Sequence, residues 1–421
     1  MLIVLLTIFT IPLVGQSQWI LQNSNAVDNL TDIVMLDSVT AIAIGDRNAI
    51  LRTTDAGTTW MNQTIMLSAT FHWNAISLEN KNYGTIAGDH TVWNTSDGGI
   101  TWKFRTAPTQ SRKIVSVLQI SPSTIYAGDE SGYVHRSLDS GNTWVEEKIS
   151  GWEIRSMFAW PGTYIWGPPI YALTPYSLYC NIGFPQPQWF EDTLEFFKGL
   201  GSEAFDGEFS REGGPGFIVG VQGDLRADPT ILRKRMLDTM WTKVPTGIMR
   251  DGVLMGVSAP SENVVYVCGT SGMLFKSTDG GDTWIDIVVP TTRTLRAIYF
   301  FDEKRGFAVG DSGTILYTSN GGVMNAREQQ EKIPDLFTLY QNYPNPFNPT
   351  TTISYRLPMT DYVTLKVYDF LGREIATLFE GMKQAGGYEV KFNGSGLAGG
   401  VYVYQLKAGK YVKTKKCVLI K

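Results

Sequence analysis

The chain has 421 residues, of which 43% are apolar and 18% charged, with 43 Gly, 19 Tyr and 12 Trp. This length allows more than one domain, and the abundance of Gly and aromatic residues is typical of an all-β protein with many tight turns. Residues 335–421 hold 11 Lys and Arg against 6 Asp and Glu, a net charge of +5, so the other 334 residues carry −9. An acidic main part argues against nucleic acid as the principal partner.

An apolar segment, Leu2–Val14, begins the chain and is followed by the small residues Gly15-Gln16-Ser17. The segment is too short to cross a bilayer. An apolar run before small residues is typical of a secretory signal peptide, although no Lys or Arg precedes Leu2. The alternative is a buried strand. We predict a signal peptide over residues 1–17 and no transmembrane segment after its cleavage.

Seven tryptophans recur along the chain with steps of 41, 42, 42, 45, 52 and 43 residues. They are Trp19, Trp60, Trp102, Trp144, Trp189, Trp241 and Trp284. A period of about 40 to 50 residues marks a repeat architecture. Four repeats carry one motif, [ST]-x-D-x-G-x-T-W, at 53–60, 95–102, 137–144 and 277–284, and a fifth copy at 318–322 stops before its Trp.

Each motif joins two alternating apolar runs, which predicts a strand, a tight turn and a second strand. A short Asp or Asn side chain accepts hydrogen bonds from nearby backbone N–H groups and braces such a turn. An apolar strand ending in Gly-Asp or a relative precedes the motif, as at Gly45-Asp46 and Gly310-Asp311, and another strand precedes that. Each repeat therefore has four predicted strands, the unit of a propeller blade.

The motif resembles the Asp-box of bacterial neuraminidase repeats, which form blades of β-propellers. In those families the box lies at the rim, away from the ligand site. The resemblance therefore implies a structural role, not a catalytic one, for the five acidic or amide residues of the boxes. These are Asp55, Asp97, Asp139, Asp279 and Asn320.

Six full repeats and one shared repeat predict an all-β, seven-bladed propeller over residues 18–322. The last repeat, Leu295–Gly322, has three strands, whereas Trp19 has no preceding strands of its own. We expect the N-terminal strand to complete the last blade, because closing the ring removes an exposed sheet edge. The repeats of Trp189 and Trp241 have lost their boxes and are rich in aromatic residues, which core packing or a partner surface would explain.

A polar linker is predicted over residues 323–336, and after it the pattern changes. Tyr343-Pro-Asn-Pro-Phe-Asn-Pro349, Leu371-Gly-Arg-Glu374 and the Lys-rich end before Cys417 resemble the type A C-terminal sorting domain of the type IX secretion system. The resemblance covers residues 337–421 and implies a small antiparallel β-sandwich that the secretion machinery recognises as its partner. The alternative is an adhesion module.

Signals of catalysis are weak. The resemblance to sialidases covers the Asp-boxes alone, and the Arg-Ile-Pro segment that announces the first sialidase arginine is missing. Three His and three Cys show no ligand spacing, so we predict no metal and no cofactor. An acidic stretch is compatible with a glycosidase pair, although such a run is more often a solvated insertion. It comprises Glu191, Asp192, Glu195, Glu203, Asp206, Glu208 and Glu212.

In length and box placement the repeats are more similar to the photosystem II assembly-factor type of propeller, a family of binding scaffolds. Propellers usually bind ligands on one face at the central channel. Aligning the innermost strands places six residues at equivalent positions: Asp32, Asn74, Val115, Arg155, Met255 and Arg296. We predict Asp32, Asn74, Arg155 and Arg296 as the ligand site for a surface protein or a glycan. The alternative is that both arginines pair with Asp32 and water.

Together these observations predict an exported, non-enzymatic binding propeller that the type IX machinery delivers to the cell surface or the medium through the periplasm. The alternative function is a sialidase-like or other glycoside hydrolase that acts on extracellular glycans.

Overall fold

The computed structural model divides the chain into two units, one up to residue 323 and one after it. The predicted signal peptide 1–17 and linker 323–336 lie outside the residues that it describes. The described residues are 19–63, 70–109, 111–161, 168–181, 188–194, 201–211, 213–223, 227–235, 238, 240–246, 248, 250–322, 338–357, 361–369, 371–383, 386–409 and 411–420.

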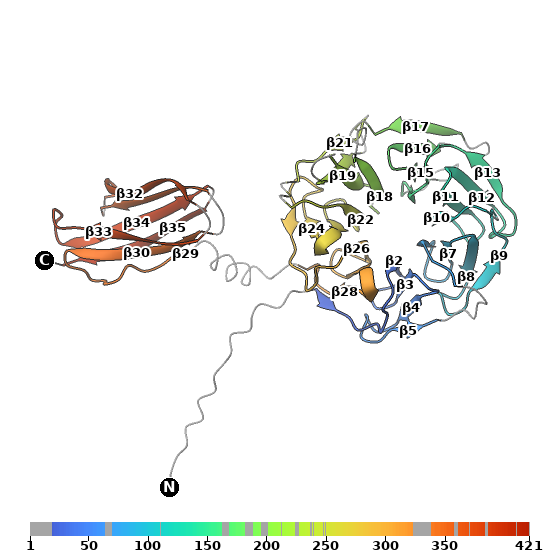
Figure 1. The fold of residues 1–421 in the computed structure, drawn as a ribbon, viewed down its shortest axis with the longest axis horizontal. Coiled ribbons are helices and arrows are strands. Elements are labelled where there is room, and N and C mark those ends of the chain that lie inside the picture. The colour runs from blue at the N-terminus through green and yellow to red at the C-terminus, as the bar shows by residue number, and fades with distance from the viewer. Residues whose placement is uncertain are drawn as a thin grey trace, which may run out of the picture. The chain divides into compact units, whose positions relative to one another are not determined.

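In the first unit the described strands form seven four-stranded antiparallel sheets, the blades, arranged in a ring (Figure 1). Blade 1 holds β2 (Leu30–Met35), β3 (Ala41–Gly45), β4 (Ile50–Thr53) and β5 (Met61–Asn62). Blade 2 holds β6 (Ala75–Leu78), β7 (Gly84–Gly88), β8 (Thr91–Thr95) and β9 (Lys103–Arg105). Blade 3 holds β10 (Ile114–Gln119), β11 (Ile125–Asp129), β12 (Tyr133–Ser137) and β13 (Val145–Lys148).

Blade 4 holds β14 (Ser156–Ala159), β15 (Ile170–Leu173), β16 (Ser177–Asn181) and β17 (Trp189–Thr193). Blade 5 holds β18 (Glu203–Phe209), β19 (Gly216–Gln222), β20 (Asp228–Lys234) and β21 (Thr242–Lys243). Blade 6 holds β22 (Leu254–Ser258), β23 (Val265–Gly269), β24 (Leu274–Ser277) and β25 (Ile285–Asp286). Blade 7 holds β26 (Leu295–Phe300), β27 (Gly306–Gly310), β28 (Ile315–Thr318) and β1 (Ile20–Leu21). Short 3₁₀ turns, η2 (Thr270–Gly272) and η3 (Asp311–Gly313), follow β23 and β27.

Burial decreases from the second strand of a blade to the fourth. All five residues are buried in β3, β7, β11, β23 and β27, because neighbouring blades cover both faces of these strands. The outer strands β5, β13 and β25 are exposed. Buried clusters connect neighbouring blades: Leu51 of blade 1 and Phe307 of blade 7 belong to one such cluster. The core of this unit is therefore a series of apolar layers between blades.

The N-terminal strand closes the ring. Ile20 pairs with Tyr317 and Leu21 with Leu316, which is the pairing expected from the isolated Trp19. Trp19 is 1% exposed and meets Phe300 edge-to-face at 5.7 Å between ring centroids. Gly322 has a φ of +65°, and a Cβ added there would lie 2.2 Å from Nε1 of Trp19. Glycine at 322 thus supplies both the left-handed backbone and the space that the closing tryptophan needs.

The second unit is a two-sheet antiparallel sandwich. One sheet contains β29 (Thr338–Leu339), β30 (Thr350–Leu357) and β33 (Gly386–Asn393), in that order. The other has the order β32 (Glu374–Lys383), β31 (Asp361–Tyr368), β34 (Gly400–Ala408) and β35 (Tyr411–Leu419). Strands alternate inward apolar and outward polar residues, as the buried Val363, Leu365 and Val367 of β31 illustrate.

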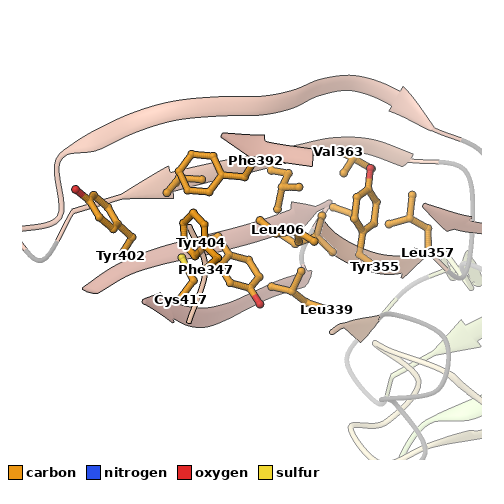
Figure 2. Packing of buried hydrophobic residues seen from close by; sticks show 14 of the residues in the cluster. Leu339, Phe347, Tyr355, Leu357, Val363, Phe392, Tyr402, Tyr404, Leu406 and Cys417 are labelled. Carbon is orange, nitrogen blue, oxygen red and sulfur yellow. The ribbon is translucent and has the colours of Figure 1, made fainter. Parts of the chain in front are cut away.

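The Pro-rich entry segment is fixed to the core of this sandwich. Phe347 is 1% exposed and packs with Phe392, and Figure 2 shows both rings within the apolar cluster. The hydroxyl of Tyr404 donates to the carbonyl of Tyr340 and accepts the N–H of Asn342, each at 2.8 Å. The buried Asn342 amide donates to the carbonyl of Pro344. The Tyr-Pro-Asn-Pro-Phe motif is therefore packed into the domain and is part of its folded structure.

Among the described residues of both units, no helix is long and apolar enough to cross a membrane.

Candidate functional site

The Asp-boxes stabilise, through side-chain hydrogen bonds, the turn between the third and fourth strands of a blade. In the first box, Oδ1 of Asp55 accepts the Thr53 hydroxyl at 2.8 Å and the Thr59 N–H at 2.9 Å, while Oδ2 accepts the Thr59 hydroxyl at 2.7 Å. Thr53 in turn accepts the N–H of Gly57. Asp97, Asp139 and Asp279 repeat these contacts, and Asn320 accepts the Thr318 hydroxyl at 3.1 Å. The N–H and hydroxyl of Thr143 and the hydroxyl of Ser137 lower the pKa of Asp139 to about 2.

The first strand of each blade faces a central channel with a cavity of about 770 Å³. The inner strands lie toward the centre of the ring in Figure 1, and the box-bearing outer pairs lie toward its rim. In β2, β10, β18, β22 and β26 the pairing with the second strand shifts by one residue near the start of the strand, a β-bulge. The bulged residues are Thr31, Val115, Phe205, Met255 and Arg296, and all line the channel.

The predicted equivalence of Asp32 with Asn74 and Arg296 is wrong by one residue. The register places Thr31 at the bulge, and Asp32 pairs with Ile44 one step further along the strand. The buried residue before this position is Leu30 in blade 1 and Trp73 in blade 2, so Thr31 corresponds to Asn74. Aligning Ile33 with Ile76 and Ile298 places Thr31, and not Asp32, at the position of Asn74 and Arg296.

Asp32 binds the neighbouring blade. Its Oδ1 accepts the N–H of Ile33 at 2.8 Å, and its Oδ2 accepts the N–H of Ile76 in blade 2 at 3.0 Å. Loss of hydration in the channel wall raises the pKa of Asp32 to about 7, although both N–H bonds oppose the shift. This carboxyl therefore connects two inner strands and changes charge near neutral pH.

Asn74 and Arg155 make the same kind of link. The Asn74 amide donates to the carbonyl of Ile114 in blade 3 at 2.7 Å, and Nη1 of Arg155 donates to the carbonyl of Ala204 in blade 5 at 3.0 Å. The guanidinium of Arg155 also pairs with Glu153 at 2.7 Å and Glu203 at 2.9 Å. Arg155 therefore pairs with the acids beside it rather than with Asp32.

Arg296 differs from these three residues because its guanidinium binds a residue of its own blade. Its Nε donates to Asp311, in the turn after β27, at 2.6 Å. The side chain is 36% exposed, against 18% for Arg155. Of the four predicted ligand residues, Arg296 therefore presents the most accessible charge at the channel mouth, and a ligand role for the four stays a prediction.

The acidic stretch does not form one group. Glu191 and Asp192 lie on the outer strand β17, where Glu191 accepts the Ser177 hydroxyl and Asp192 lies 3.4 Å from Lys234. Glu203 pairs with Arg155. Glu195 and Glu212 lie outside the described residues. Asp206 and Glu208 belong to β18 and line the channel, so this part of the stretch is an inner strand and not a solvated insertion.

Asp206 and Glu208 are the channel residues best suited to acid–base chemistry. Two residues apart on one strand, they face the same side. Oδ2 of Asp206 accepts the N–H of Val257 at 3.1 Å, and Oε2 of Glu208 accepts the N–H of Ala259 at 2.9 Å, both in blade 6. Loss of hydration raises the pKa of each carboxyl. Such a carboxyl retains a proton that an exposed one loses, as a general acid requires.

Two of the three histidines have structural partners. His135 is fully buried, with Nε2 at 3.0 Å from the buried carboxylate of Asp129, which also pairs with Arg112 at 2.7 Å. His72 lies 2.9 Å from Asp46. Within the described ranges, no group of three His, Cys, Asp or Glu is placed to hold a metal ion.

Blade 4 presents an aromatic pair made of the exposed Trp152, three residues before Arg155, and the half-buried Tyr176. Trp152, in the segment that enters blade 4, is 56% exposed. It meets Tyr176, in the turn after β15, at 4.9 Å between ring centroids and 79° between planes. Both residues lie in the aromatic-rich repeat that ends at Trp189, but the sequence does not show that they touch.

Two family models match the chain. The model of the photosynthesis system II assembly factor YCF48 matches residues 11–147 and 230–329, more than half of the chain. The model of the secretion system C-terminal sorting domain matches residues 341–421. Both agree with the resemblances drawn from the Asp-boxes and from the Tyr-Pro-Asn-Pro-Phe segment.

Individual relatives are distant. The photosystem II stability/assembly factor HCF136 of Oryza sativa subsp. japonica chloroplasts is 24% identical over 283 residues, which are 65% of this chain and 63% of the relative. The chain thus spans less than two thirds of that relative.

Two solved structures share the fold. A structure of YCF48 bound to D1 peptide has a TM-score of 0.58 at 20% identity and covers 73% of this chain and 98% of the other. A GH74 xyloglucanase from Xanthomonas campestris has a TM-score of 0.56 at 15% identity and covers 80% and 59%. From these matches, the chain belongs to the photosynthesis system II assembly factor YCF48 family and ends in a secretion system C-terminal sorting domain.

Proposed function

We propose that this chain is an exported, non-catalytic propeller that binds an extended peptide segment of a partner protein at the channel mouth. One observation carries the proposal: the polar side chains of the channel wall are engaged with the backbone of the next blade. Asp32, Asn74, Arg155 and Asp206 all make such bonds. Groups that hold the ring together are poor candidates for proton transfer, because a catalytic acid must move its proton to a substrate.

The sorting domain supports export. Its family match covers the C-terminal 81 residues, 341–421, which hold every described strand of the sandwich except β29. A propeller that carries this domain is delivered by the type IX machinery to the cell surface or the medium. Its partner is therefore an extracellular or surface protein.

The choice of a peptide rests on the relatives and on the mouth itself. The YCF48 structure contains a D1 peptide, so at least one propeller of this family binds a peptide. In the present chain the channel wall offers a cation, Arg296. In the segment that leads to the channel residue Arg155, the exposed Trp152 meets the half-buried Tyr176. Guanidinium groups bind carbonyl and carboxylate oxygens, and aromatic side chains anchor interfaces.

A glycoside hydrolase is the second candidate, and the raised pKa values of Asp206 and Glu208 favour it. Two carboxyl groups of this kind are what glycosidases use. The GH74 likeness supports the fold alone at 15% identity. We rank this function second because both carboxyls already bind backbone N–H groups of blade 6.

The test is selection of peptides from a random display library on the immobilised full-length protein, followed by calorimetric titration of the recovered peptides. We expect saturable binding that Arg296→Ala weakens by about tenfold, since a hydrogen bond to a charged group contributes about 1.5–3 kcal/mol. Arg250→Ala is the matched control, because Arg250 is 46% exposed and pairs with Asp286 of the outer strand β25. Failure to recover any saturable peptide, or equal loss in both variants, contradicts the proposal.

A further inference from the structure

Trp152 is exposed far beyond what is usual for its residue type. Its side chain is 56% exposed, whereas tryptophan is on average highly buried. The half-buried Tyr176 stands almost perpendicular to it, at 79°, so that the two rings meet edge to face and form a corner. Burial does not explain this arrangement, because neither wall is part of an apolar core cluster among the described residues.

The corner is held rigidly by its backbone. The N–H of Trp152 donates to the Ser150 hydroxyl at 3.0 Å. The turn that carries Tyr176 replaces the Gly-Asp turn of other blades with Thr174-Pro175. The Thr174 hydroxyl accepts the N–H of Ser177 at 2.9 Å, and the carbonyl of Pro175 accepts the N–H of Ala204 at 2.8 Å. A preformed pair of rings loses little conformational entropy when a ligand binds.

The surroundings of the corner are negatively charged. Next to Trp152 in the chain, Glu153 pairs with Arg155, and Arg155 also pairs with Glu203. Two carboxylates and one guanidinium leave a net charge of −1. The carboxylates face water more than the cation does, since Glu153 and Glu203 are 36% and 35% exposed and Arg155 is 18% exposed. Arg155 is turned inward, over the ring of Phe205 at 4.5 Å.

We propose that the corner formed by Trp152, Tyr176, Glu153 and Glu203 binds a lysine or arginine side chain of the partner peptide. A cation over the face of an indole is attracted by its quadrupole, and perpendicular aromatic walls are the usual receptor for an ammonium group. The excess carboxylate strengthens the attraction, and the net charge of −9 outside residues 335–421 acts in the same direction. This inference rests on the proposed function and specifies the chemistry of the partner.

The test uses full-length protein labelled with 5-fluorotryptophan, with the Trp152 resonance assigned from Trp152→Phe. The probes are the capped peptide Gly-Gly-Lys-Gly-Gly and its norleucine analogue, which has the same alkyl chain without the charge. We expect the lysine peptide to shift the Trp152 resonance saturably and the norleucine peptide to do so at least about fivefold more weakly, as a cation–π contact requires. Equal shifts by both peptides, or no shift at millimolar concentration, overturn the proposal.

Variants separate the corner from a general surface effect. Trp152→Ala and the double variant Glu153→Gln, Glu203→Gln are expected to weaken binding of basic peptides recovered from the display selection by about five- to tenfold. Phe104→Ala is the matched control: Phe104 is 57% exposed and also meets a neighbour, Trp93, edge-to-face, but on the outer strand β9. If selected peptides bind without any basic residue and Trp152→Ala leaves their affinity unchanged, this inference fails while the proposed function stands.

Discussion

Nε of Arg52 in blade 1 donates to the carbonyl oxygen of Gly98, in the Asp-box of blade 2, at 3.1 Å. The same link recurs around the ring: Asn94 to Ser140 at 2.9 Å, Arg233 to Gly280 at 2.7 Å and Lys276 to Gly321 at 3.3 Å. In each case a third-strand side chain binds the box residue that follows the Asp or Asn. The Asp-box therefore presents a carbonyl to the preceding blade in addition to bracing its own turn.

Replacing Arg52 with Met should destabilise the propeller. The variant keeps the alkyl stem but removes the donor, which leaves the Gly98 carbonyl without this bond and costs about 1.5–3 kcal/mol. Urea unfolding followed by tryptophan fluorescence measures the change. Arg47→Met is the control, because Arg47 is 70% exposed and pairs with Asp28 at 3.3 Å, so its loss should cost less than about 1 kcal/mol. Equal effects of the two variants would contradict an inter-blade role for Arg52.

Removing a box carboxylate should affect stability and leave binding intact. Asp279→Ala deletes the bonds to Ser277 and Thr283 and is expected to cost on the order of 1 kcal/mol. Burial opposes ionisation of Asp279, but the hydroxyl and N–H of Thr283 outweigh it and lower its pKa to about 2. Its contribution is therefore present above pH 3.8 and is lost as the pH falls through about 2. Weaker peptide binding with an unchanged melting temperature would refute a purely structural box.

The contribution of Asp32 to the stability of the ring should depend on pH with the sign opposite to that of Asp279. Its folded-state pKa is about 7, above the value of 3.8 in the unfolded chain, because the channel wall disfavours the charged form. The folded state thus binds more protons between these values, and the contribution to stability is complete below pH 3.8 and lost as the pH rises through about 7. Melting temperatures of wild type and Asp32→Asn, measured from pH 4 to 8, should converge or cross as the pH rises. Parallel curves would exclude a raised pKa.

Export should depend on the C-terminal sandwich. Deleting residues 337–421 removes the sorting domain and leaves the described ring intact, since β1 closes blade 7 without it. We expect the truncated chain to accumulate, folded, in the periplasm of a host with the type IX machinery. Fractionation and immunoblotting measure its location, with the intact chain as control. Truncated protein at the cell surface would show that the sandwich is not the export signal.

The fold was predictable because a propeller repeats its signals. The Trp ladder and the boxes mark each blade, and the isolated Trp19 indicates how the ring closes. The sorting domain was equally predictable from its sequence motif, and two residues of that segment, Phe347 and Asn342, are buried in the sandwich. These features depend on local turn chemistry and on side-chain periodicity, both of which a single sequence displays.

The channel was less predictable because it depends on register and on contacts between blades. The strand register places Thr31 at the bulge of β2, so Asp32 lies one position further along the strand than predicted. The partners of Arg155 come from two separate segments, at Glu153 and Glu203, and the meeting of Trp152 with Tyr176 requires the loops of one blade to converge. Asp206 and Glu208 belong to the inner strand β18, but the acidic residues around them gave the segment the composition of a polar insertion.

The central claim, that the channel carboxyls hold the ring together and do not catalyse, is tested most directly by one assay. Purified full-length protein is incubated with xyloglucan and with sialylated glycans from pH 4 to 8, and release of reducing ends and of free sialic acid is measured beside the double variant Asp206→Asn, Glu208→Gln. The account predicts no release above the blank for either protein and a lower melting temperature for the variant, because the bonds to Val257 and Ala259 are weakened. Turnover by the wild type that the double variant abolishes would contradict it.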